Sequence, residues 1–205
     1  MTSAVVHLVR HGEVDNPGHV LYGRLPGFRL SPSGERMAIT TAKALADRDI
    51  VVVRSSPLER AQQTAAPLAE LLGLEVGVDD RLIESANVFE GSVGGWRRPA
   101  NWRYLYNPLR PSWGEPYRSV AERVLAAAAD AARDAEGHEA VLVSHQLPIW
   151  VARLAAQGER LWHRPDRREC ALGSVTSLRY DDNRIVDVSY SEPAGSVGRR
   201  TVGGA

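Results

Sequence analysis

Several residue types and sequence features are rare or absent in this chain, and each absence excludes a class of protein. One cysteine, Cys170, in 205 residues leaves no internal disulfide and no cluster of thiol ligands. The six histidines show no compact spacing for a metal. No apolar run approaches the roughly 20 residues that span a bilayer, and no signal peptide is recognisable at the start. These absences predict a cytoplasmic protein with no metal and no membrane partner.

Net charge is also absent, because 25 basic residues balance 25 acidic ones and the pI is about 7.0. Binding to nucleic acid or an anionic membrane usually needs a positive surface, so no nucleic-acid partner is expected. Lys43 is the only lysine, and the remaining basic residues are arginines. Arginine suits phosphate binding. However, abundant Ala, Gly and Arg together are typical of a GC-rich genome, so only individually placed arginines carry weight.

Apolar runs that alternate with helical patterns are what the chain does have. Continuous or alternating apolar residues predict strands over 4–9, 50–53, 74–78, 140–143, 174–180 and 184–190, the last two as a hairpin. Helical spacing and capping residues predict helices after Ser31-Pro32, after a capping box at Ser56–Glu59, from about Ser119, and over 146–156. This order predicts an α/β fold, a three-layer sandwich whose mostly parallel, doubly wound sheet carries helices on both faces.

A single domain over residues 1–192 fits this length. Within it, the periodicity dissolves from Asp79 to Pro116, and an insertion over about 85–117 is predicted to be a lid or binding loop. Its aromatic and basic residues either contact an organic, anionic substrate or pack the segment onto the body: Trp96, Trp102, Trp113, Arg97, Arg98, Arg103 and Arg110. Residues 193–205, rich in glycine and small side chains, are predicted to form a flexible tail.

The most informative stretch is Val9–Glu13, where an apolar strand ends. Arg10 offers a charged, fork-shaped donor, and His11 offers a nitrogen that is neutral and nucleophilic near pH 7. The carboxyl ends of parallel strands share one edge of a sheet. Arg60 and His145 follow two other strands, so we expect them to converge with His11 on a phosphate-binding pocket. Taken singly, a surface arginine and a structural histidine are simpler interpretations.

Together these motifs resemble the histidine phosphatase superfamily, which contains the cofactor-dependent phosphoglycerate mutases and related acid phosphatases. The resemblance is carried, in order, by Leu8–Glu13, Ser55–Ala65, Arg81–Glu84 and Val143–His145, and it covers about Val6 to Tyr180. It implies a phosphoglycerate mutase-like fold. It also implies a phosphatase that hydrolyses a small phosphomonoester to inorganic phosphate with no cofactor and no metal.

The same resemblance assigns catalytic roles to five residues. His11 is implied as the nucleophile that forms a phosphohistidine. Arg10, Arg60 and His145 are implied to hold the phosphoryl oxygens and stabilise the charge during transfer. Glu84 is implied to protonate the leaving oxygen and then to accept a proton from water. That double role needs a carboxyl that is partly desolvated.

The chain also departs from the family pattern around the pocket. Asn16, Arg24 and Gln146 are candidate substrate contacts. Gln146 stands where glycine commonly follows Ser-His, Asn16 is one residue closer to His11 than in many relatives, and segment 85–91 is one position shorter. These changes disfavour the alternative of phosphoglycerate mutase-type transfer. A non-catalytic module that binds a phosphorylated ligand or partner is a second alternative. The natural substrate and a homodimer are both left open.

Overall fold

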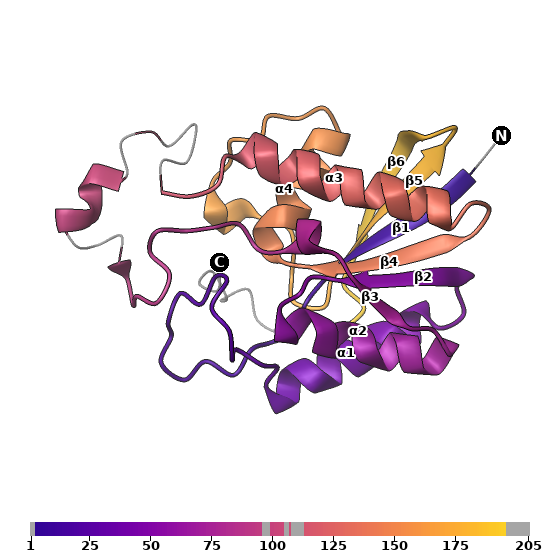
Figure 1. The fold of residues 1–205 in the computed structure, drawn as a ribbon, viewed down its shortest axis with the longest axis horizontal. Coiled ribbons are helices and arrows are strands. Elements are labelled where there is room, and N and C mark those ends of the chain that lie inside the picture. The colour runs from indigo at the N-terminus through magenta and orange to yellow at the C-terminus, as the bar shows by residue number, and fades with distance from the viewer. Residues whose placement is uncertain (1–2, 96–98, 105–106, 108–112, 196–205) are drawn as a thin grey trace.

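The computed structural model describes residues 3–95, 99–104, 107 and 113–195. Six strands form one sheet in the order β3-β2-β4-β1-β5-β6 (Figure 1). The strands are β1 (Ser3–Arg10), β2 (Ile50–Ser55), β3 (Val76–Val78), β4 (Glu139–Ser144), β5 (Val175–Asp181) and β6 (Arg184–Ser191). The helices are α1 (Pro32–Leu45), α2 (Glu59–Leu72), α3 (Tyr117–Asp134) and α4 (Gln146–Ala156), with short 3-10 turns η1 (Asp80–Leu82), η3 (Pro99–Tyr104) and η4 (Pro165–Arg167).

The sheet is mostly parallel, as the alternation of strands and helices predicts. Strands β3, β2, β4 and β1 pair in parallel, and β5 and β6 are added antiparallel. The β5–β6 turn places Asp182 and Asn183 at φ 43° and 62°, which is the geometry of a tight hairpin. The predicted hairpin is therefore confirmed.

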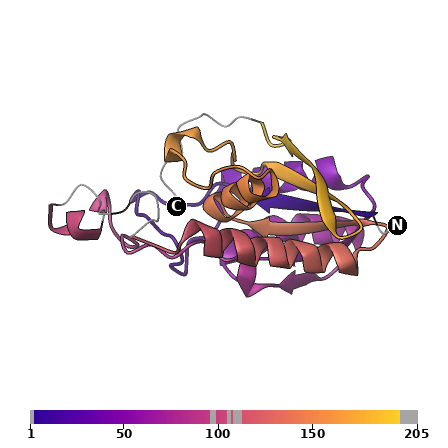
Figure 2. The same cartoon turned by 90° about the horizontal axis from the view of Figure 1, so that it is seen from above.

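Helices cover both faces of the sheet, so the predicted three layers are confirmed. Helices α1 and α2 lie on one face, and α3 and α4 lie on the other (Figures 1 and 2). Strand β4 shows why, since Leu142 packs in the core with α3 and α4 while Val141 and Val143 pack with α1 and α2. A strand that is apolar on both sides needs a helix layer on each face.

Local signals place most helix ends where the sequence predicts them, with one exception. Ser31 caps α1 by accepting a hydrogen bond from the Gly34 N–H at 3.0 Å, and Gly73 ends α2 at φ 66°. The predicted capping box at Ser56 is wrong, because α2 begins at Glu59 and no side chain caps it. The Ser56 hydroxyl instead lies 2.8 Å from Nε2 of His145, a buried ring that needs a partner.

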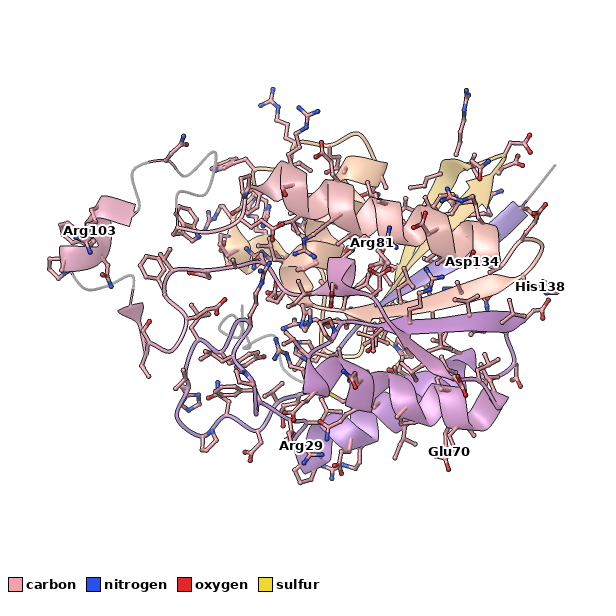
Figure 3. The ribbon with its side chains drawn as sticks, viewed as in Figure 1. Arg29, Glu70, Arg81, Arg103, Asp134 and His138 are labelled. Atoms are coloured by element: carbon pink, nitrogen blue, oxygen red, sulfur yellow. The ribbon has the colours of Figure 1, made fainter. Side chains whose placement is uncertain are left out.

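The described residues between η1 and α3 extend away from the body at the carboxyl end of the parallel strands, and η3 stands apart from the sheet in both views (Figures 1 and 2). Figure 3 shows Arg103 on this outlying turn, whereas Arg81 lies on η1 against the body. The Trp102 side chain is 63% exposed, so it does not pack the segment onto the body. Trp96, Arg97, Arg98 and Arg110 lie outside the described residues, and a lid function stays a prediction. Within the described part of the chain, no helix has the length and apolarity to cross a membrane.

Candidate active site

The predicted site residues meet at the carboxyl ends of β1, β2 and β4. Backbone hydrogen bonds join the three strand ends directly, from His11 N to the Ser144 carbonyl at 3.1 Å and from Ser56 N to the Val143 carbonyl at 2.9 Å. The first turn of α2 brings in Arg60, and the turn after β4 brings in His145. Parallel strands with connecting helices therefore gather residues that are far apart in the sequence.

His11 is held in one tautomer. Its Nδ1 lies 2.7 Å from the Gly12 carbonyl, an acceptor, so Nδ1 carries the proton and Nε2 keeps a lone pair. Burial lowers the pKa of His11 well below 6.5, and the charges of Arg60 and Arg10 lower it further. The ring is 1% exposed. At neutral pH His11 is consequently an uncharged imidazole with Nε2 available as a nucleophile.

Two buried arginines stand beside this ring. Arg10 donates from Nη1 to the Cys170 carbonyl at 2.7 Å, and Arg60 donates from Nη2 to the Gly23 carbonyl at 2.6 Å. The Arg60 guanidinium also lies 4.7 Å from the centre of the Tyr22 ring, a cation–π distance. Burial lowers the pKa of Arg60, which reflects the cost of enclosing a cation without a paired anion.

His145 is the second buried imidazole, with its ring centre 5.1 Å from that of His11. The Ser56 oxygen accepts the Leu58 N–H at 3.4 Å, so the hydroxyl proton is free to be donated to Nε2 of His145 at 2.8 Å. Nδ1 then carries the ring proton. Burial lowers the pKa of His145 well below 6.5, and nearby Arg60 adds to this effect. His145 is therefore a neutral donor through Nδ1.

The cluster holds hydrogen-bond donors that no protein acceptor uses. Among the described residues, five buried side-chain nitrogen or oxygen atoms have no partner, and three of them are Nε of Arg10, Nε of Arg60 and Nδ1 of His145. An unpaired buried donor costs about 1–3 kcal/mol. Donors grouped beside His11 in this way suit an anion with several oxygens, such as a phosphoryl dianion.

Glu84 completes the predicted set from the turn after η1. It is 2% exposed, and one carboxylate oxygen accepts the Ser85 N–H at 2.8 Å. Burial raises the pKa of Glu84, against the opposing effects of that N–H and of nearby Arg60, Arg168 and Arg10. A carboxyl with a raised pKa can both give and take a proton near its working pH.

The three predicted substrate contacts differ in how far their polar groups are already used. Both ends of the Asn16 amide bond the Val20 backbone, at 2.9 and 3.1 Å, and close the loop over 16–20. Arg24 donates to the Glu84 carbonyl at 2.7 Å and pairs with Glu115. Gln146 accepts from Nη1 of Arg168 at a long 3.4 Å. Arg24 and Gln146 border the cluster through these partners, and the amide of Asn16 is occupied in holding its own loop.

Sequence reasoning missed three residues of this site: Ser56, Tyr22 and Arg168. Ser56 fits a helix-capping pattern, which concealed its bond to His145. Tyr22 lies in an irregular loop, and Arg168 lies among exposed arginines, so neither has a periodic signal. Among the described residues, no three His, Cys, Asp or Glu side chains gather as a metal-binding group.

Comparisons with known proteins agree with this geometry. The family model described as histidine phosphatase superfamily (branch 1) matches residues 6–192. An uncharacterized protein of Mycobacterium tuberculosis is 58% identical over 194 residues, covering 92% of this chain and 96% of the relative. A probable phosphoglycerate mutase of Enterobacter sp. is 31% identical, covering 83% of each chain. The structure of mycobacterial glucosyl-3-phosphoglycerate phosphatase superposes with a TM-score of 0.73 at 26% identity, covering 92% of this chain and 96% of that one.

Proposed function

The chain belongs to branch 1 of the histidine phosphatase superfamily, and from this we propose that it is a metal-independent phosphatase that hydrolyses a small phosphomonoester through a phosphohistidine on His11. One observation carries the proposal. A neutral imidazole with a lone pair on Nε2 stands among three buried donors that have no acceptor in the part of the chain that the structure describes. A nucleophile beside donors that can hold phosphoryl oxygens is what transfer of a phosphoryl group requires.

In the first step, Nε2 of His11 attacks phosphorus and the ester oxygen leaves with the proton of Glu84. Arg10, Arg60 and His145 donate to the phosphoryl oxygens as charge is redistributed among them. In the second step, water attacks the phosphohistidine while the Glu84 carboxylate takes its proton. Inorganic phosphate and neutral His11 result, and Glu84 is protonated again. Each proton that Glu84 gives is therefore recovered within one turnover.

Phosphoryl transfer to a second substrate is the other candidate function, and the 31% identity to a probable phosphoglycerate mutase favours it. The two functions differ in who accepts the phosphoryl group, water or an organic hydroxyl. Incubation with 3-phosphoglycerate and its bisphosphate primer, followed by product analysis, separates them. Free phosphate supports the phosphatase, and 2-phosphoglycerate supports the mutase.

The covalent step is tested with a labelled aryl phosphate. The reaction is stopped in alkaline detergent, which preserves phosphohistidine, and the labelled residue is located by mass spectrometry. The wild type is expected to carry label on His11 and to release phosphate in the presence of a chelator. His11→Asn should lose both. His19→Asn is the matched control, because His19 is exposed on a loop at φ 47°, a conformation that asparagine tolerates. Turnover retained by His11→Asn contradicts the proposal.

A further inference from the structure

We propose that Arg168 forms an anion-binding subsite on the leaving-group side of the pocket, so that the natural phosphomonoester carries a second anionic group, such as a carboxylate, on its organic part. This inference rests on the proposed function. It adds a substrate class and assigns a role to Arg168.

The position of Arg168 links it to the phosphate-binding cluster. It follows η4 in the segment between α4 and β5, and two residues further on the Cys170 carbonyl accepts the hydrogen bond from Arg10. The backbone that anchors one phosphate-binding arginine therefore also carries Arg168. Gly173 N continues this link by donating to the Arg10 carbonyl at 3.1 Å.

Neutral groups hold the guanidinium in place. Nε donates to Nε2 of His163 at 2.9 Å, and Nη1 donates to the Gln146 amide oxygen at 3.4 Å. Nδ1 of His163 lies 2.7 Å from the Leu161 carbonyl, which places the ring proton there and leaves Nε2 as the acceptor. The fork is thus oriented by partners that do not cancel its charge.

Gln146, which accepts from Arg168, directly follows His145 of the cluster, so Arg168 borders the same pocket. The positive charge of Arg168 also acts to lower the pKa of Glu84. In the proposed mechanism Glu84 gives its proton to the leaving oxygen, so Arg168 lies on the side where the organic part departs. When Glu84 is protonated, no carboxylate among the described residues pairs with the guanidinium, whose hydrogen-bond partners are His163 and Gln146. A substrate anion on the leaving group would take that place.

Three esters test the inference: phenyl phosphate, 3-carboxyphenyl phosphate and the neutral 3-carbamoylphenyl phosphate. The wild type should prefer the carboxylate over the carbamoyl ester by about 10- to 100-fold in kcat/KM, the worth of a charge-assisted pair. Arg168→Met should bring this ratio close to one, and Arg168→Lys should retain part of it. Arg167→Met, a neighbouring exposed arginine, should keep the wild-type ratio.

The possible outcomes distinguish failure of the Arg168 subsite from failure of the proposed phosphatase activity. Turnover of all three esters without preference, or a preference that survives in Arg168→Met, overturns the inference and leaves the phosphatase standing. If Arg168→Met loses kcat/KM equally on all three esters, Arg168 acts only on the pKa of Glu84, and this result also overturns the inference. Failure of the wild type to hydrolyse any ester refutes the function and the inference together. Should methionine prevent folding, judged by thermal melting, Arg168→Gln supplies the neutral variant.

Discussion

Removal of one buried hydroxyl, in Ser56→Ala, probes how the fold sets the donor state of His145. The Ser56 side chain is fully buried and lies 2.8 Å from Nε2 of His145, while Nδ1 has no partner among the described residues. Without the hydroxyl, neither ring nitrogen has a protein partner. The proton is then free to occupy Nε2, and Nδ1 can no longer donate to a phosphoryl oxygen.

The expected loss of activity in Ser56→Ala follows from the free-energy cost of a buried nitrogen without a hydrogen-bond partner. That cost is about 1–3 kcal/mol, and a tenfold change in rate corresponds to about 1.36 kcal/mol. If the loss is expressed in the transition state, kcat/KM falls by about 5- to 150-fold. The effect should be seen mainly in kcat, because the donor acts on charge that is redistributed during transfer.

Ser55→Ala is the matched control. Ser55 is the preceding residue, is equally buried, and donates to the Ser56 carbonyl at 2.8 Å without touching His145. Both variants should lose about 1 kcal/mol of unfolding free energy in urea, but only Ser56→Ala should lose activity on phenyl phosphate. A loss below twofold in Ser56→Ala, or an equal loss in both variants, refutes the reasoning.

Three further predictions concern pH, charge and packing. Burial lowers the pKa of His11 below 6.5 and raises that of Glu84 above 4.5. The value of kcat/KM should therefore rise with pH as His11 becomes neutral and fall as Glu84 loses its proton. A profile without a fall on the alkaline side contradicts these roles. Arg81 lowers the pKa of Asp79 below 3.8, so the carboxylate stabilises the fold above that pH and ceases to do so as pH falls through the lowered pKa. Asp79→Asn should therefore lower the unfolding free energy in urea by about 1 kcal/mol at pH 7, and an undiminished difference at pH 2.5 counts against the assignment. A Cβ at Gly12 would lie 2.5 Å from a backbone oxygen at the start of α1, so Gly12→Ala should lower the unfolding free energy by about 1–3 kcal/mol, measured by thermal melting. The control Gly18→Ala, whose Cβ would have only a 3.4 Å side-chain contact, should melt like the wild type. Equal melting of the two variants refutes the packing argument.

Most elements of the fold are predictable from the sequence because their causes are local. The apolar run before Arg10 becomes β1, and helical spacing over 146–156 becomes α4 with the same bounds. Ser31 and Gly73 mark helix ends through hydrogen bonds within a few residues. The order of strands has no such local cause. Strand β1 lies between β4 and β5, both of which follow it by more than a hundred residues.

The residues of the candidate site also differ in whether a local sequence pattern predicts them. Motifs identify Arg10, His11 and Arg60 as site residues because their types and neighbours match a pattern. Ser56 was misinterpreted because the sequence places it beside a helix start, whereas its partner His145 is 89 residues away. Arg168 has no motif at all, and its role depends on contacts with side chains from other elements.

The sequence by itself determined which segments form strands and helices, and which side chains could carry phosphoryl chemistry, because those properties depend on residue type and short-range spacing. Tertiary structure alone decided the chemical state of the groups. Burial and distant neighbours keep His11 neutral, raise the pKa of Glu84 and leave Nε of Arg10 and Nε of Arg60 without an acceptor among the described residues. Solvation and charge at a point depend on everything packed around it, and that environment exists only once remote segments have come together.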